Sequence, residues 1–188
     1  MPKTLQFKAL CHLYADDVYR FARHLLGSEA DAEDASQEVL LKLWHGLGDV
    51  NLLKARSWLM QTTRNHCLDL LRRRQRHGLE PLPEDDFAHD HARSSEPDPR
   101  ESTQWADLRE DLAAALQLLP EKQRSVFVLV EINGLRYREV ATTLELPLNS
   151  VKVYLSRAKQ TLQGHLQRHH PSTSNAKDHE TASEQAHA

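Results

Sequence analysis

The stretch that decides the fold reads GLRYREVATTLELPLNSVKVYLSRAKQTL and covers residues 134–162. Apolar residues recur at helical spacing over 137–144, a turn containing Pro147 follows, and Asn149 is expected to cap a second helix. One face of that helix is apolar. Its opposite face is polar and cationic and holds Asn149, Lys152, Val153, Ser156, Arg157 and Lys159. The pattern predicts a helix-turn-helix over 137–159, although a helical hairpin with a solvated basic face would share it.

The rest of the chain is also predicted to be helical. Of its 188 residues 39% are hydrophobic and 6% are aromatic, which is thin for a sheet protein and too little for one large core. Helical spacing predicts helices over 5–26, 30–47 and 56–76, a loop over 49–55, and further helices from about 103 to 119 and over 121–132. The fold class is therefore all-α, with two small helical domains over 5–77 and 103–168.

A different composition separates the two predicted domains. Residues 78–102 contain four prolines and many acids, which predicts a flexible acidic linker rather than a packed element. The polar residues 169–188 are expected to be a disordered tail. No apolar run approaches the roughly 20 residues that span a membrane, and the N-terminus lacks a signal-like apolar segment, so a cytoplasmic location is expected.

The net charge of −3 conceals blocks of opposite sign. Residues 28–38 hold five acids and no base, whereas residues 56–76 hold six arginines and one acid. Such blocks indicate either local binding faces for charged partners or ordinary solvated helix faces. Twelve histidines raise the possibility of a metal site. The chain nevertheless lacks His-Glu-x-x-His and Cys-x-x-Cys, so we expect no metal, no cofactor and no catalysis.

Three blocks of sequence, in the same order, resemble the sigma-70 family of bacterial RNA polymerase sigma factors. AEDASQEVLLKLW (32–44) resembles region 2.1–2.2, and SWLMQTTRNHCLDLLRRR (57–74) resembles regions 2.3–2.4. LPEKQRSVF (119–127), with 134–141 and 149–159, resembles region 4. The short linker makes the chain similar to the extracytoplasmic-function (ECF, group 4) sigma factors, and the resemblance covers about residues 5 to 168.

The resemblance implies a dissociable subunit of RNA polymerase that selects promoters. Its acidic helix would dock on core polymerase through Asp34, Gln37, Glu38, Leu40, Leu41 and Trp44. The first domain would recognise and melt the −10 element, with a loop at 50–56 capturing a flipped base. The matching positions are Leu52, Leu53, Lys54, Arg56, Asn65, Arg72, Arg73 and Arg76.

The second domain would read the −35 element with the outer face of the helix that follows Pro147. Among the matching positions, Lys152 and Arg157 are the expected base contacts, while Lys159, Arg138 and Arg124 are expected at phosphates. Asn149 and Ser156 complete the set. Val153 departs from the small polar residue common at its place, so an apolar contact with a thymine methyl becomes available.

The family also implies an anti-sigma factor, usually membrane-bound, that would hold the protein inactive at the inner membrane. The acidic linker would either enter the polymerase active-site cleft or act as an inert tether. A plain helix-turn-helix repressor or activator is the competing interpretation. Such a protein would need neither an acidic docking helix nor a base-capturing loop.

Overall fold

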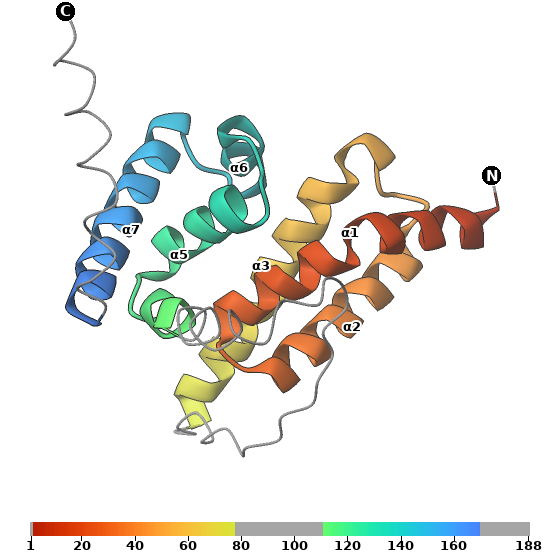
Figure 1. The fold of residues 1–188 in the computed structure, drawn as a ribbon. Helices are drawn as coiled ribbons and strands as arrows, with labels where there is room; N and C mark the ends of the chain where they lie inside the picture. Colours follow the sequence, from red (N-terminus) through yellow and green to blue (C-terminus); the bar gives the residue numbers. More distant parts are fainter. Residues whose placement is uncertain (1, 78–110, 170–188) are drawn as a thin grey trace, which may run out of the picture.

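The computed structural model describes residues 2–77 and 111–169, and all regular elements within them are helices (Figure 1). The expected linker, 78–102, and the expected tail beyond residue 169 lie outside this part of the chain. A further stretch, 111–117, is helical and precedes α5. The remaining elements are α1 (Lys3–Leu26), α2 (Glu29–Gly46), η1 (Leu52–Lys54), α3 (Ala55–His77), α5 (Glu121–Phe127), η2 (Val128–Ile132), α6 (Tyr137–Thr143) and α7 (Leu148–His169). The all-α fold class is thus confirmed.

The N-terminal helices α1, α2 and α3 form one bundle, and the turn between α1 and α2 follows the sequence signals. Gly27 adopts the left-handed conformation, with φ of 76°, and its N–H bonds the carbonyl of Arg23. Ser28 then accepts a hydrogen bond from the backbone N–H of Asp31 and caps α2. This compact turn sets α1 and α2 side by side.

The core of the bundle is small. It contains Val18, Phe21 and Leu25 from α1, Val39 and Leu43 from α2, and Leu59 and Met60 from α3. Cys67 is also buried, which raises its pKa to about 12, and both cysteines are free thiols. Trp44 is only half-buried and packs edge to face on Phe7, with ring centroids 5.1 Å apart.

The C-terminal helices depart from the predicted elements at two points. The expected helix over 121–132 continues beyond α5 as a π-helical turn, η2. Asn149 lies in the first turn of α7 rather than at its cap. The helix begins at Leu148, two residues before the start that a cap at Asn149 would give, because the N–H of Val151 already bonds the carbonyl of Pro147, at 3.2 Å. Pro147 cannot donate a hydrogen bond itself, so it suits the position just before the helix.

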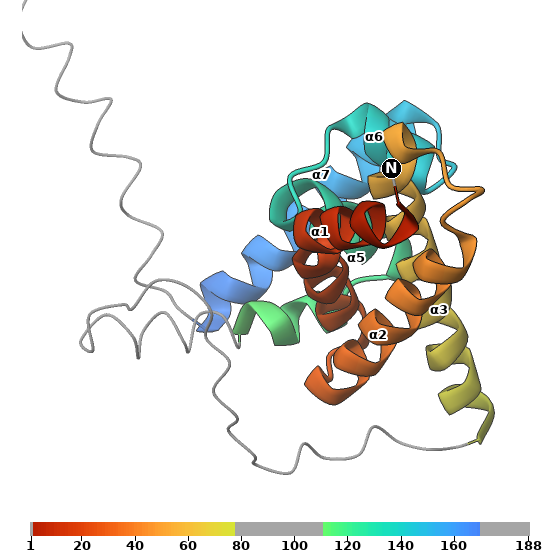
Figure 2. The same cartoon turned by 90° about the vertical axis from the view of Figure 1, so that its right-hand side faces the viewer.

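The two groups of helices pack against each other (Figures 1 and 2). Helix α3 contacts α6, and α1 contacts both α5 and η2. Sequence periodicity predicted two domains and a linker, but it did not predict this contact. No helix in the described ranges is long and apolar enough to cross a membrane.

Truncation of Leu59 tests the core of the N-terminal bundle. Leu59 is fully buried, so Leu59→Ala should lower the free energy of unfolding by about 2–5 kcal/mol through lost burial and a residual cavity. Leu53, which is 97% exposed, gives a matched control, and Leu53→Ala should change stability by less than about 0.5 kcal/mol. Urea unfolding of the full chain measures both. Equal losses in the two variants would contradict the packing described here.

His24 links stability to pH. Burial, together with the positive charges of Arg23 and Arg20, lowers the pKa of His24 to about 4 from an ordinary value of 6.5. Between these values the unfolded chain binds the proton and the folded chain does not, so stability falls as pH drops from 6.5 towards 4. His24→Gln should remove up to about 3 kcal/mol of that fall, measured by urea unfolding across the pH range. Parallel pH profiles for the variant and the wild type would exclude this linkage.

Candidate nucleic-acid and protein interfaces

The outer face of α7 carries all six side chains predicted from the helix-turn-helix pattern. Asn149, Lys152, Val153, Ser156, Arg157 and Lys159 are exposed. The opposite face is buried through Val151, Leu155, Ala158 and Leu162. Helix α6 packs against α7. A helix supported along one side, with cations and small polar groups along the other, has the form that enters a major groove.

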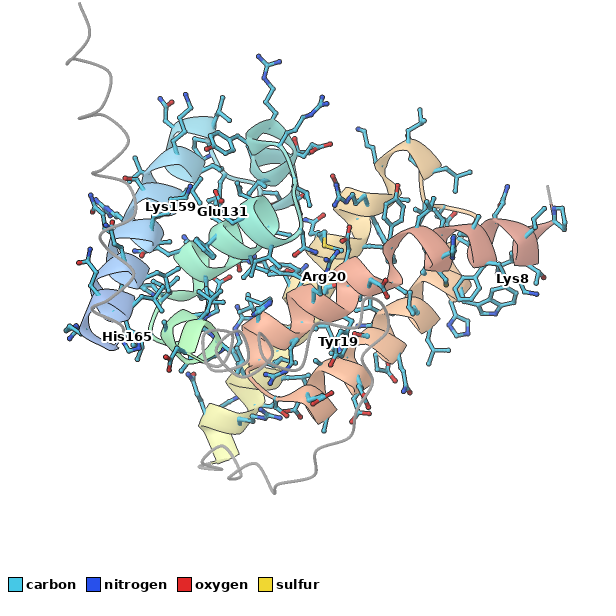
Figure 3. The ribbon with its side chains drawn as sticks, viewed as in Figure 1. Lys8, Tyr19, Arg20, Glu131, Lys159 and His165 are labelled. Carbon is cyan, nitrogen blue, oxygen red and sulfur yellow. The ribbon has the colours of Figure 1, made fainter. Side chains whose placement is uncertain are left out.

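The cationic side chains of α7 differ in whether they have a partner within the protein. Lys159 forms an ion pair with Glu131 of η2, with 2.9 Å between Nζ and Oε1, and this hydrogen bond raises the pKa of Lys159 (Figure 3). Within the described part of the chain, Lys152 and Arg157 have no ion pair or hydrogen bond through their side chains. Their charges are therefore available to an outside anion. Val153 lies beside them and is 46% exposed.

Two further arginines predicted at phosphates lie in different surroundings. Arg138 is exposed on α6. The guanidinium of Arg124 is turned inward, where it donates to the carbonyls of Leu25, Gln117 and Leu119 and to the side-chain oxygen of Gln117. Burial lowers the pKa of Arg124. In this arrangement Arg124 ties α5 to the end of α1, a role that the sequence pattern did not reveal.

The loop before α3 presents an exposed apolar tip. Asn51 accepts a hydrogen bond from the N–H of Leu53 at 3.0 Å and so shapes the short helix η1. Leu53 projects almost fully into solvent, and Leu52 and Lys54 are exposed beside it. A large apolar side chain held in the open on an ordered loop suits insertion into a partner or stacking with a base. This is the loop that the sequence predicted to capture a flipped base.

The predicted basic stripe of α3 is divided between two sides of the helix. Asn65 and Arg72 line a cleft of about 570 Å³ that α3 shares with Glu121 and Lys122. Arg73 instead faces the cleft towards α2. Arg76 is exposed near the end of the helix. The stripe is divided because Arg73 follows Arg72 by one residue, which turns it by about 100° around the helix.

Arg56 is separated from the remainder of this predicted site. Its guanidinium is half-buried and bonds the carboxylate of Asp17 through Nε and Nη2, at 3.0 and 2.8 Å. Nη2 also donates to the backbone carbonyl of Asn133 at 2.5 Å. Arg56 therefore joins α1 and α3 to the turn that precedes the helix-turn-helix.

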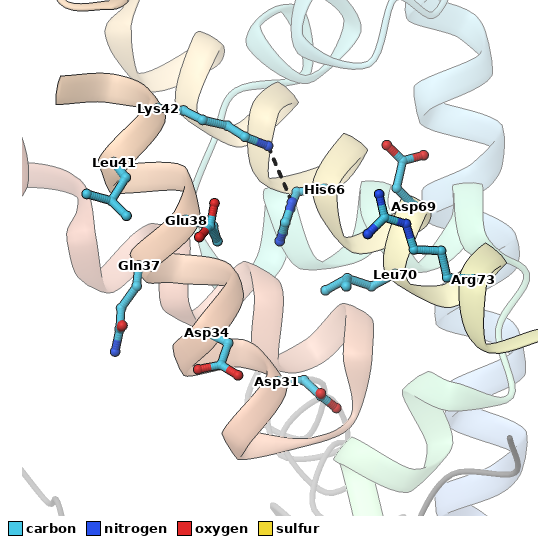
Figure 4. Close-up of a pocket in the computed structure, with 10 residues that line it drawn as sticks. All are labelled: Asp31, Asp34, Gln37, Glu38, Leu41, Lys42, His66, Asp69, Leu70 and Arg73. Carbon is cyan, nitrogen blue, oxygen red and sulfur yellow. Dashed lines mark hydrogen bonds between the residues drawn. The ribbon is translucent and has the colours of Figure 1, made fainter. Parts of the chain in front are cut away.

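The acidic helix α2 presents a mixed polar surface. Asp34, Gln37, Glu38 and Leu41 are exposed, whereas Leu40 and Trp44 are half-buried. The four exposed residues line a cleft of about 590 Å³ between α2 and α3 (Figure 4).

The α3 side of this cleft was not singled out from the sequence, apart from Arg73. His66, Asp69 and Leu70 lie there opposite the carboxylates of α2. Lys42 crosses from α2, with its Nζ 3.4 Å from His66 Nδ1. Burial lowers the pKa of His66, as does the nearby charge of Lys42. Helical spacing along α3 could have placed His66, Asp69 and Leu70 on one face, but it could not have paired that face with α2.

In the ranges 2–77 and 111–169 no three His, Cys, Asp or Glu side chains are grouped as metal ligands would be. A helix-turn-helix with free cations, a basic helix beside an exposed loop tip, and an acidic cleft are features typical of a DNA-binding transcription factor.

Comparisons with known proteins specify the family. Residues 10–77 match the model of Sigma-70 region 2, and residues 109–162 match that of Sigma-70 region 4. The RNA polymerase sigma-H factor of Pseudomonas aeruginosa is 30% identical over 146 residues, covering 73% of this chain and 74% of that protein. The ECF RNA polymerase sigma factor SigE of Mycolicibacterium smegmatis is 36% identical over 164 residues, covering 87% of this chain. The chain spans 63% of that relative's length.

Two solved structures share the fold. The sigma factor RpoE of Bartonella quintana, in complex with the anti-sigma factor NepR, has a TM-score of 0.66 and 25% identity, covering 86% of this chain and 96% of that one. CnrH, in complex with the cytosolic domain of CnrY, has a TM-score of 0.63, covering 86% of this chain and 88% of that one. The chain belongs to the ECF RNA polymerase sigma factors, a family of transcription initiation factors rather than enzymes.

Proposed function

We propose that this chain binds core RNA polymerase and directs it to promoters with a −35 and a −10 element. The observation that carries the proposal is the division of α7 into a buried apolar face and an exposed face with free cations. Two other surfaces are assigned to −10 recognition and to polymerase binding. The loop with α3 binds the −10 element, and the cleft between α2 and α3 docks on the polymerase.

Reading of the −35 element is assigned to the outer face of α7. Lys152 and Arg157, free of partners in the described residues, can donate to guanine edges in the major groove. Val153 lies between them on the same face and offers an apolar contact to a thymine methyl. Arg138 and Lys159 act at phosphates, which position the helix without specifying sequence.

Recognition of the −10 element is assigned to the exposed loop tip and the basic end of α3. Extrusion of a base costs a few kcal/mol of unstacking. Leu52 and Leu53 can contact the extruded base, while Arg72, Arg73 and Arg76 attract its backbone. These contacts would offset the cost of melting.

Docking on core polymerase is assigned to the cleft lined by Asp34, Gln37, Glu38 and Leu41. Carboxylate and amide groups there can accept from and donate to polar groups of a partner helix. An anti-sigma factor is proposed to hold the chain inactive, since the RpoE relative was solved with one. The protein would then act in the cytoplasm, either free or retained at the inner membrane by that partner.

Removing one cation from α7 tests the −35 assignment. Lys152→Ala or Arg157→Ala should weaken promoter binding by the holoenzyme by about 1–3 kcal/mol if the side chain reads a base edge, and should leave binding to core polymerase unchanged. Lys8→Ala is the matched control, because Lys8 is an exposed lysine on α1 far from α7 (Figure 3). Fluorescence anisotropy with promoter duplexes measures the affinity. Loss of promoter binding equal to that of Lys8→Ala would contradict the assignment.

The docking face makes the converse prediction. Gln37→Ala combined with Glu38→Ala should lower the affinity for core polymerase at least tenfold, about 1.4 kcal/mol, and leave duplex DNA binding intact. Glu33→Ala, at another exposed acid of α2, is the control. Titration of labelled protein with core polymerase reports the affinity. If the double variant and the control bind alike, the cleft is not the docking face.

A further inference from the structure

One cation on the outer face of α7 is paired with an acid of a neighbouring element. Lys159 Nζ lies 2.9 Å from Glu131 Oε1, and the two side chains are 51% and 36% exposed (Figure 3). Lys152 and Arg157, on the same face, have no such partner within the described residues. The pair therefore forms at the protein surface, where both solvent and a polyanion can reach it.

The π-helical turn η2 presents Glu131 to α7. The N–H of Asn133 bonds the carbonyl of Val128, five residues earlier, at 2.9 Å, so this turn is one residue wider than an α-helical turn. Val128 and Leu129 are buried, whereas Glu131 in the same turn is exposed. The turn thus buries apolar residues and leaves the carboxylate of Glu131 facing Lys159.

Lys159 lies on the part of α7 that suits a contact with the DNA backbone. It follows Lys152 by two helical turns, about 10.5 Å along the axis and on the same side of the helix. A recognition helix contacts base edges through its N-terminal residues. A cation two turns further along is placed for a phosphate, as the proposed function assigns it.

The ion pair changes what Lys159 contributes at a phosphate. An unpaired lysine that contacts a phosphate releases a counterion from the DNA, and this release supplies sequence-independent affinity. A lysine paired with a carboxylate adds no net charge, so Lys159 must first leave Glu131 to make the same contact. The contribution of Lys159 is therefore reduced, while Lys152 and Arg157 keep their full charges.

We infer that Glu131 is a positioning residue that holds Lys159 back from DNA phosphate and so limits the sequence-independent affinity of α7 for duplex DNA. The inference rests on the proposed function, because it concerns the same DNA-binding face. Tight binding then depends on the base contacts of Lys152 and Arg157 more than on attraction to phosphate. A chromosome offers a large excess of non-specific sites, and weaker phosphate contacts reduce the share of the chain that these sites retain.

The substitution Glu131→Gln keeps the shape of an exposed side chain and removes its charge. The full-length variant should bind a short duplex of mixed sequence several-fold more tightly at about 0.1 M salt, and at most about eightfold. The slope of log affinity against log salt concentration should steepen by about 0.9, the value for one added phosphate contact. A GC-rich duplex should show the same gain, since a phosphate contact does not read sequence.

Fluorescence anisotropy over a range of salt concentrations measures both the affinity and the slope. Glu33→Gln makes the same change of charge at an exposed acid of α2 and is the control. Weaker binding by Glu131→Gln, or binding equal to that of Glu33→Gln, would overturn the inference.

The same substitution in a Lys159→Gln background shows whether Glu131 acts through Lys159. In that background the slope should not steepen, because no lysine remains at this position to displace a counterion. An equal steepening with and without Lys159 would mean that Glu131 acts on DNA independently of the pair, and the inference would be wrong.

Titration of the wild-type chain with core polymerase and with duplex DNA separates the inference from the proposed function. If the wild type binds neither of them, the proposed function fails and the inference fails with it. If the wild type binds both and Glu131→Gln matches the control, only the inference fails.

Discussion

The described helices are amphipathic and pack through their apolar sides, although some large apolar side chains, such as Leu53 and Val153, remain exposed. The sequence is 39% hydrophobic, and the buried apolar side chains of the described ranges form one cluster to which both groups of helices contribute. The opposite faces carry charged side chains, and two of these, Lys152 and Arg157 of α7, have no ion pair or hydrogen bond within the described residues. The free cations of α7, the acids of α2 and the arginines of α3 all follow from this division.

Charged side chains also take part in the contact between the two groups of helices. Arg64 of α3 pairs with Glu121 of α5 across this contact. Arg56 of α3 is paired with Asp17 of its own group and donates to the carbonyl of Asn133 across the contact, while Arg124 donates to the carbonyl of Leu25 at the end of α1. Arginine side chains that can bind an external polyanion can also form ion pairs with carboxylates of the same chain at close range. Two of the residues proposed to bind DNA, Asn65 and Arg72 of α3, thus line a cleft that α3 shares with α5.

Sequence periodicity was sufficient to predict the helices and the exposed face of α7, because both depend on the spacing of residues three and four positions apart. Periodicity could not predict contacts between side chains that lie far apart along the sequence. Asp17 and Arg56 are 39 residues apart, and Arg64 and Glu121 are 57 apart. No local pattern pairs them. The inward turn of Arg124 was missed for this reason, and the start of α7 at Leu148 was missed because Asn149 resembles a cap.

The most direct measurement is titration of the purified full chain against bacterial core RNA polymerase, followed by transcription from a library of genomic promoter fragments. Saturable binding, with transcripts that start only at promoters sharing two spaced elements, is the predicted result. Retained binding to duplex DNA without any binding to core polymerase would contradict the account. The chain would then act on DNA without the polymerase, as a repressor or activator does.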